Sequence, residues 1–211
     1  MNKKYLAGII IVSIAVICFI VFILINNISI VHKETFEVND EHDNARTFAV
    51  YDNGNLIGSG NENGSWALLQ LSPSYSFGVK FNNIDIKQGA EIKTAYILLY
   101  SVGTPMNRYP NCKIYCDNTD NAVNFSEIGV LNISGRKYTI NYALWNETVE
   151  FEKWVKTPSL VSPIQEVINR KNWKPGNSIA FLFITEGKLD YSATFQNFEN
   201  GYPPKLYVEW V

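Results

Sequence analysis

The longest pattern in the chain is an unbroken apolar run near its start. Residues 5–25 contain no charged side chain, and Ser13 is the only hydroxyl inside the run beyond Tyr5 at its edge. As a helix, these 21 residues would extend about 32 Å at about 1.5 Å each, which matches the hydrocarbon core of a bilayer at about 30 Å. The pattern therefore predicts a transmembrane helix over residues 5–25.

The flanks of this run predict a retained anchor and its orientation. The apolar region of a cleaved signal peptide spans only about 7–15 residues and ends at a small-residue cleavage site, whereas this run leaves through Ile25-Asn26-Asn27-Ile28 without Ala-x-Ala. Lys3 and Lys4 precede the run and mostly acidic residues follow it, so the positive-inside rule places residues 1–4 in the cytoplasm. A cleaved signal and a pilin-type leader are the alternatives. We expect a single-pass cell-membrane protein whose C-terminal domain is extracellular.

The next segment, residues 26–46, is polar and shows no period, so we interpret it as a linker that holds both histidines, His32 and His42. Beyond it, short apolar or alternating segments are separated by turn signals, as in β-strands. The clearest is 91–100, which has Ala95, Ile97 and Leu99 on one face and further apolar residues on the other; two buried faces predict a central strand. The other predicted strands cover 47–51, which ends in the hairpin turn 52–54, and 56–57, 66–71, 76–81, 113–116, 137–144, 178–185, 191–195 and 205–211.

One helix is predicted late in the chain, within residues 159–170. Ser162 is the expected N-cap, with Pro163 in the first helical position and Gln165 in the capping-box position. Three residues at helical spacing, Ile164, Val167 and Ile168, form its apolar stripe. We prefer a helix that closes one end of a sandwich over a lid for a ligand. About ten short strands and this helix predict an all-β fold, an antiparallel jelly-roll β-sandwich over residues 47–211.

Charge and composition exclude some function classes. Lys3 and Lys4 account for two of the 18 basic residues, so the rest of the chain is acidic overall, with 20 carboxylates and no basic cluster; this argues against nucleic acid as a partner. With histidine confined to the linker, a Ser-His-Asp arrangement lacks its base, and no glycine-rich phosphate loop is present. We expect a protein that is not an enzyme. A glycan-cleaving enzyme is the alternative, with carboxylates available at Glu150, Glu152, Glu166 and Asp190.

The segment after residue 111 raises two questions of local chemistry. Cys112 and Cys116 would lie about 13 Å apart on an extended strand, beyond the roughly 7 Å limit between the Cα atoms of a disulfide, so they pair only if the strand bends sharply. The following loop is rich in the oxygen ligands that calcium favours, with candidates at Asp117, Asn118 and Asp120. The alternative to calcium is an Asx-turn loop that holds no ion.

Three stretches, Gly78–Tyr96, Lys113–Ser126 and Thr157–Asn177, carry a resemblance to a known family. The third is the most specific, with Ile-Gln-Glu-Val-Ile-Asn-Arg followed by Trp173 and Gly176-Asn177. Together they resemble the DNRLRE-type, disaggregatase-related β-sandwich domains of archaeal and bacterial surface proteins over residues 47–211. The resemblance implies a jelly roll similar to carbohydrate-binding modules. The family often has Gly-Glu-Asp where this chain has Cys116-Asp117-Asn118.

The candidate ligand-binding residues are aromatic, because the apolar face of an aromatic ring can stack on a sugar ring while polar neighbours bind its hydroxyls. The candidates are Trp66, Tyr109, Trp145, Trp154 and Tyr202, with a place in the core or at its edge as the alternative for each. Asn-x-Ser/Thr sequons give glycosylation candidates at Asn63, Asn124, Asn132 and Asn146, besides Asn27 next to the anchor.

The expected function is a membrane-anchored cell-surface module that recognises glycan or an envelope partner such as a surface-layer protein. The alternative is a structural subunit of an envelope assembly that makes protein contacts. A patch of coplanar exposed aromatics would favour glycan binding, and a cleft holding two carboxylates would favour the glycan-cleaving enzyme. A flat apolar patch or an exposed sheet edge would favour protein contacts.

Overall fold

The computed structural model describes residues 16, 30–52, 55–63, 68–72, 74–103, 110–126, 133, 135–185 and 192–211, without the side chains of 47–52 and 55–63. Apart from Val16, the predicted anchor over residues 5–25 lies outside the described residues, as do residues 1–4. Within the described part of the chain, no helix is both long and apolar enough to cross a membrane. The chain divides into two compact units, Met1–His32 with Val211, and Lys33–Trp210.

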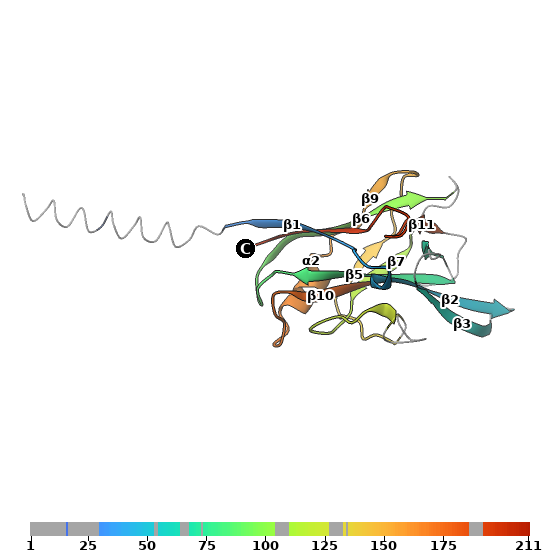
Figure 1. The fold of residues 1–211 in the computed structure, drawn as a ribbon, viewed down its shortest axis with the longest axis horizontal. Helices are drawn as coiled ribbons and strands as arrows, with labels where there is room; N and C mark the ends of the chain where they lie inside the picture. Colours follow the sequence, from blue (N-terminus) through green and yellow to red (C-terminus); the bar gives the residue numbers. More distant parts are fainter. Residues whose placement is uncertain are drawn as a thin grey trace, which may run out of the picture. The chain divides into compact units, whose positions relative to one another are not determined.

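The second unit is a β-sandwich of two antiparallel sheets, drawn as two layers in Figure 1. In the order of pairing, sheet 1 contains β1 (His32–Glu37), β12 (Lys205–Trp210), β6 (Ile92–Val102), β11 (Ala193–Phe195) and β4 (Leu69–Leu71), and β9 (Trp154–Lys156) also pairs with β6. Sheet 2 contains β3 (Asn55–Asn63), β2 (Asn44–Asp52), β5 (Tyr75–Ile84), β10 (Asn177–Thr185), β7 (Cys112–Cys116) and β8 (Ala143–Trp145). The all-β prediction is thus confirmed for the described residues.

The core between the sheets follows from alternation along the strands. Phe77, Val79 and Phe81 of β5 are fully buried, and the Phe77 ring stacks on Phe183 of β10 with centroids 4.3 Å apart. On β6 one face is buried through Ala95, Ile97 and Leu99. Its other face is half-buried, and β6 pairs with β12, β9 and β11, so its predicted central place is confirmed.

The pattern missed two strands and misplaced the ends of others. Residues 30–46, within the expected linker, contain β1, the 3₁₀ helix η1 (Glu41–Asp43) and the first residues of β2. In β1 only Phe36 is buried, so its sequence has no alternation to detect. The strand β9 has three residues, too few for a period to show. Asp52 pairs with Asn55 in the β2–β3 hairpin, and residues 53 and 54 of the predicted turn lie outside the described residues.

The helix α2 (Val161–Ile168) forms where the apolar stripe predicts it, and Ile164, Val167 and Ile168 are buried. The capping prediction was wrong. Leu160 is the N-cap residue and makes no side-chain capping bond. The Gln165 side chain instead joins the helix to sheet 1, because it donates to the carbonyl of Ala90 at 2.9 Å and accepts from the N–H of Ile92 at 2.9 Å.

A second, smaller core covers the outer face of sheet 2. It is formed by strand residues and by the connection that follows β7, namely Ala45, Ala122, Phe125, Ile133, Ala180 and Leu182. A Cβ at Gly78 of β5 would lie 2.5 Å from the Phe125 ring, so only glycine lets that ring lie on the strand. Cys112 and Cys116 are both free and buried on β7, in line with their expected separation, and burial raises the pKa of both thiols.

Candidate ligand-binding site

Three aromatic rings meet on the outer face of sheet 1: Tyr100 of β6, Trp154 of β9 and Tyr202 from the loop before β12. Tyr100 and Trp154 lie directly opposite each other on paired strands, and their rings meet edge to face with centroids 5.6 Å apart. Tyr202 stacks on Tyr100 at 4.1 Å and lies 6.2 Å from the Trp154 ring. We call these three residues the aromatic cluster.

Local structure fixes each ring of the aromatic cluster. The turn before β9 is held by the N–H of Ser101 donating to the carbonyl of Lys153 at 2.9 Å, and Tyr100 donates its hydroxyl to the carbonyl of Glu152 at 3.2 Å. Glu152 has a φ of +51°, a left-handed conformation that makes this turn tight. Near Tyr202, the fully buried Asn197 accepts from the N–H of Asn200 at 3.2 Å and closes the preceding turn.

Charged side chains border the cluster. Lys205 places its Nζ 5.2 Å from the centre of the Trp154 ring and pairs with Glu37 at 2.8 Å. Along the same face, Tyr96 and Tyr207 stack at 5.0 Å, and Lys156 lies over Tyr96 at 3.8 Å. The face therefore combines apolar ring surface with cations at short range.

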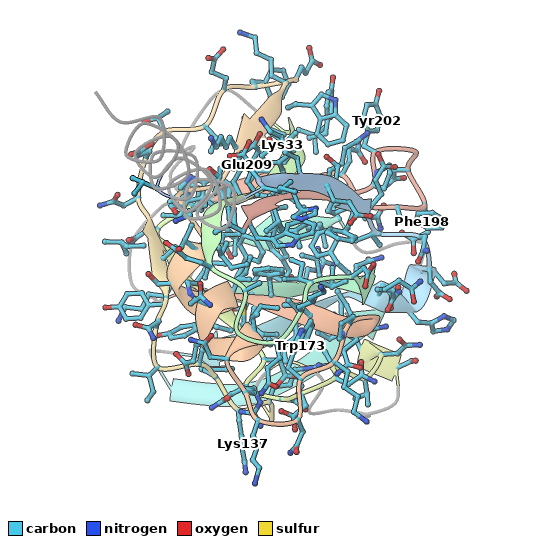
Figure 2. All side chains as sticks on the ribbon, turned by 90° about the vertical axis from the view of Figure 1, so that its left-hand side faces the viewer. Lys33, Lys137, Trp173, Phe198, Tyr202 and Glu209 are labelled. Carbon is cyan, nitrogen blue, oxygen red and sulfur yellow. The ribbon has the colours of Figure 1, made fainter. Side chains whose placement is uncertain are left out.

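At the far end of this face, several side chains donate hydrogen bonds to one carboxylate, Glu209. The Tyr207 hydroxyl donates to Glu209 at 2.6 Å, and Lys33 and Thr94 also donate to Glu209, at 3.1 Å and 3.0 Å. The hydrogen bond to Glu209 raises the pKa of Tyr207 to about 12, and the bonds from Tyr207, Lys33 and Thr94 lower the pKa of Glu209 to about 2. In Figure 2, Lys33 and Glu209 lie beside each other, Tyr202 lies toward the same upper side, and Lys137 projects at the opposite edge.

A shallow pocket of about 230 Å³ lies beside Trp154. Its polar lining includes Glu147, Glu150, Lys153 and Lys156. This volume is below the roughly 300–1,000 Å³ of pockets that enclose drug-sized ligands. The pocket is therefore suited to one ring-sized polar group that contacts Trp154 at its rim.

The structure places the five aromatic candidates in different environments or leaves them outside the described residues. Trp154 and Tyr202 come together, and Trp154, at 40% exposed, is the only tryptophan classed as exposed among the described residues. Trp145 was wrongly placed at a binding surface, because its side chain is 1% exposed and stacks on Phe195 in the core. Trp66 and Tyr109 lie outside the described residues. Tyr100 was missed, although its place on the outer face of 91–100 was a usable signal.

The calcium candidates face arginines. Arg136 donates to Asp117 at 2.6 Å in a buried pair, and Arg170 donates to Asp120 at 2.7 Å and to Asn118. Burial raises the pKa of Asp117 against the opposing effect of Arg136, whereas the bond from Arg170 lowers the pKa of Asp120. The described residues include no group of three or more acidic, histidine or cysteine side chains that could hold a metal ion. The side chains of Asp117, Asn118 and Asp120 thus each accept a hydrogen bond from an arginine. Calcium binding stays a prediction, and it would require Arg170 to move.

The carboxylates considered for catalysis have different local environments, and the described ones make structural contacts. Glu150 pairs with Lys153, Glu152 is the left-handed turn residue, and Asp190 lies outside the described residues. Burial raises the pKa of Glu166. Hydrogen bonds from the N–H groups of Asn141 and Ile140 lower it by more than burial raises it, so the pKa lies below its usual range. His42 belongs to η1 rather than to a linker, and its bond with Asp40 raises its pKa.

The sequons differ in their surroundings. Asn146 is exposed at the end of β8. Asn124 is half-buried and accepts a hydrogen bond from Lys80. Asn63 ends β3, where its side chain is not described, and Asn27 and Asn132 lie outside the described residues.

A second surface is apolar and lies near β8, which ends sheet 2 in the order of pairing. Ile140, Tyr142 and Leu144 are 86%, 45% and 50% exposed. The backbone beneath Ile140 is nevertheless fixed, because Glu166 accepts from the N–H of Ile140 and of Asn141, each at 2.9 Å. A pocket of about 470 Å³ adjoins this contact and is lined by Asn141, Val161, Ser162, Gln165, Glu166 and Asn169.

Comparison with known proteins found neither a family model nor a curated protein that matches this chain.

Proposed function

We propose that the protein is a membrane-anchored cell-surface module that binds glycan through the aromatic cluster and the pocket beside it. The observation that carries the proposal is the exposed Trp154, joined by Tyr100 and Tyr202 on one face and bordered by Lys205. Rings present C–H-binding apolar faces, and the surrounding lysines and carboxylates supply hydrogen bonds to hydroxyls. The resemblance to disaggregatase-related jelly rolls supports the same function.

The location proposed is the outer side of the cell membrane. It rests on the uncharged run over residues 5–25 and on the lysines before it. An anchored module binds neighbouring envelope glycans at high local concentration, so modest affinity per site is enough.

A glycan array tests the proposal with the full chain in detergent. We expect binding by the wild type to a limited set of glycans, and loss of that binding in Trp154→Ala. Leu144→Ala is the matched control, because Leu144 is also an exposed apolar residue on a three-residue strand but lies on β8. Absence of binding to every glycan, or equal loss in both variants, would overturn the proposal.

A chelator arm of the same array addresses calcium. If binding falls with chelator and returns with added calcium, the prediction of a calcium site at Asp117, Asn118 and Asp120 is supported. If chelator changes nothing, that prediction is removed while the aromatic site stands. A hydrolysis assay on the bound glycans addresses the enzyme alternative, and we expect no cleavage.

The alternative function is protein contact, and the apolar surface near β8 favours it. The knob formed by Ile140 adjoins a pocket on the same surface. A knob beside a pocket is self-complementary, so a second copy of this chain related by a two-fold axis is the partner that fits. Sedimentation of wild type against Ile140→Ser tests this: a dimer lost in the variant supports it, and a wild-type monomer at every concentration overturns it.

A further inference from the structure

Lys80 is a buried lysine on the outer face of β5, with 5% of its surface exposed. Lysines are almost never buried without a partner, because transfer of the ammonium out of water is costly. Its Nζ donates to Asp43 at 2.6 Å, and Asp43 is 1% exposed. The same Nζ also contacts the side-chain Oδ1 of Asn124.

Several of the residues around this contact are small or apolar. Gly78, two positions before Lys80, allows the Phe125 ring to lie against β5, and this places the adjacent Asn124 over the strand. Ala180 pairs with Lys80, and Ala45 pairs with Gly78. The second oxygen of Asp43 accepts from Asn82. An amine, an amide and a carboxylate are therefore held together in a site from which most water is excluded.

We propose that Lys80 and Asn124 form an intramolecular isopeptide bond, with Asp43 moving the protons. In the first step Lys80 gives a proton to Asp43, which its Nζ already contacts. The free Nζ attacks Cγ of Asn124, whose carbonyl oxygen it already contacts. The Nζ–Cγ bond forms, the Cγ–Nδ2 bond breaks, and ammonia leaves. Asp43 gives its proton to Nδ2 and takes one from Nζ, so it ends as a neutral acid.

The reaction needs no oxidant and no cofactor, because it exchanges one amide for another. Asn124 is the electrophile and Asp43 is not, since Asp43 is needed to carry the protons and both of its oxygens already accept hydrogen bonds. The bond would join residues 44 positions apart and fix the connection after β7 on the outer face of sheet 2. It would also consume the nitrogen that a glycan on the Asn124 sequon would need. The inference is independent of the proposed glycan binding.

Mass spectrometry of the full wild-type chain, purified from a host without N-glycosylation, tests the bond directly. We expect an intact mass lower than the sequence mass by one ammonia, and a branched peptide that contains Lys80 and Asn124 after proteolysis. An intact mass equal to the sequence mass would overturn the proposal. Loss of one water, which signals a bond between Lys80 and Asp43, would overturn the assignment of Asn124.

Variants separate the role of Asp43 from a role in folding. Asp43→Asn keeps the size of the side chain but cannot move protons, so we expect the full sequence mass and a melting temperature lower by about 10 °C from the lost loop closure. Glu41→Gln is the control, because Glu41 is an exposed carboxylate of the same 3₁₀ helix η1 and its loss should leave the ammonia loss intact. Ammonia loss at Asn124 in Asp43→Asn would contradict the role of Asp43. If that variant does not fold, the wild-type mass still decides whether the bond exists.

Discussion

At the scale of single residues, Gly78 is the position where one added carbon has the clearest consequence. In Gly78→Ala the new Cβ would lie 2.5 Å from the Phe125 ring, so the ring must shift off β5. We expect a loss of about 1–3 kcal/mol from overpacking, reduced by the better strand propensity of alanine. Urea unfolding measures it. In a double-mutant cycle with Phe125→Leu the two changes should couple, and additive effects would show that the ring is not the cause.

The residue scale is also where sequence reasoning was least complete. The alternation of Phe77, Val79 and Phe81 was readable because those side chains enter the main core. Gly78 and Lys80 lie on the opposite face, which is normally solvated, and here it is covered by a connection 40 or more residues later in the chain. A local pattern cannot report such a contact. Trp145 was misassigned for a related reason, since burial of a tryptophan depends on its tertiary neighbours.

At the scale of elements, two substitutions in α2 test how this helix is attached to the rest of the fold. Gln165→Ala would leave the N–H of Ile92 and the carbonyl of Ala90 without their side-chain partner, which costs about 1–3 kcal/mol. Ser162→Ala should change the free energy of unfolding by less than about 0.5 kcal/mol, because Leu160 is the N-cap. Thermal unfolding compares them. A larger effect at Ser162 would restore the capping box that the sequence predicted.

The contact between α2 and the segment before β8 depends on pH through Glu166. Hydrogen bonds lower its pKa below the usual range in the folded protein, so its contribution to stability is present above about pH 4.5 and is lost as pH falls through the folded value. Glu166→Gln should cost about 1 kcal/mol at pH 7 in this partly solvated site. The difference from wild type should shrink in acid. Urea unfolding at several pH values measures it, and a pH-independent difference would contradict this role.

Elements were predicted best where burial imposes a period. β6 and α2 were found because each presents a regular apolar face. β1 was missed because pairing with β12 rather than burial makes it a strand, and β9 because three residues carry no period. Since Trp154 lies on β9 and Tyr202 on a loop, the sequence could nominate both rings but could not place them together.

At the scale of the whole molecule, the apolar run over residues 5–25 is predicted to anchor the β-sandwich at the membrane. We expect the full chain to sediment with membranes and to stay there in alkaline carbonate, because about 21 apolar residues span a bilayer. A chain that begins at residue 30 should be released to the soluble fraction. Protease added to intact cells should degrade the C-terminal domain. Protection from external protease would contradict the predicted orientation.

The central claim is that Trp154 and its neighbours bind glycan. Isothermal titration of the full chain with the glycan that binds best on the array tests it most directly. Loss of the Trp154 ring removes a central aromatic contact. Trp154→Ala should therefore raise the dissociation constant roughly thirtyfold, equivalent to about 2 kcal/mol of binding free energy. Leu144→Ala should leave the constant within about twofold of wild type. Equal affinity in wild type and Trp154→Ala would contradict the account.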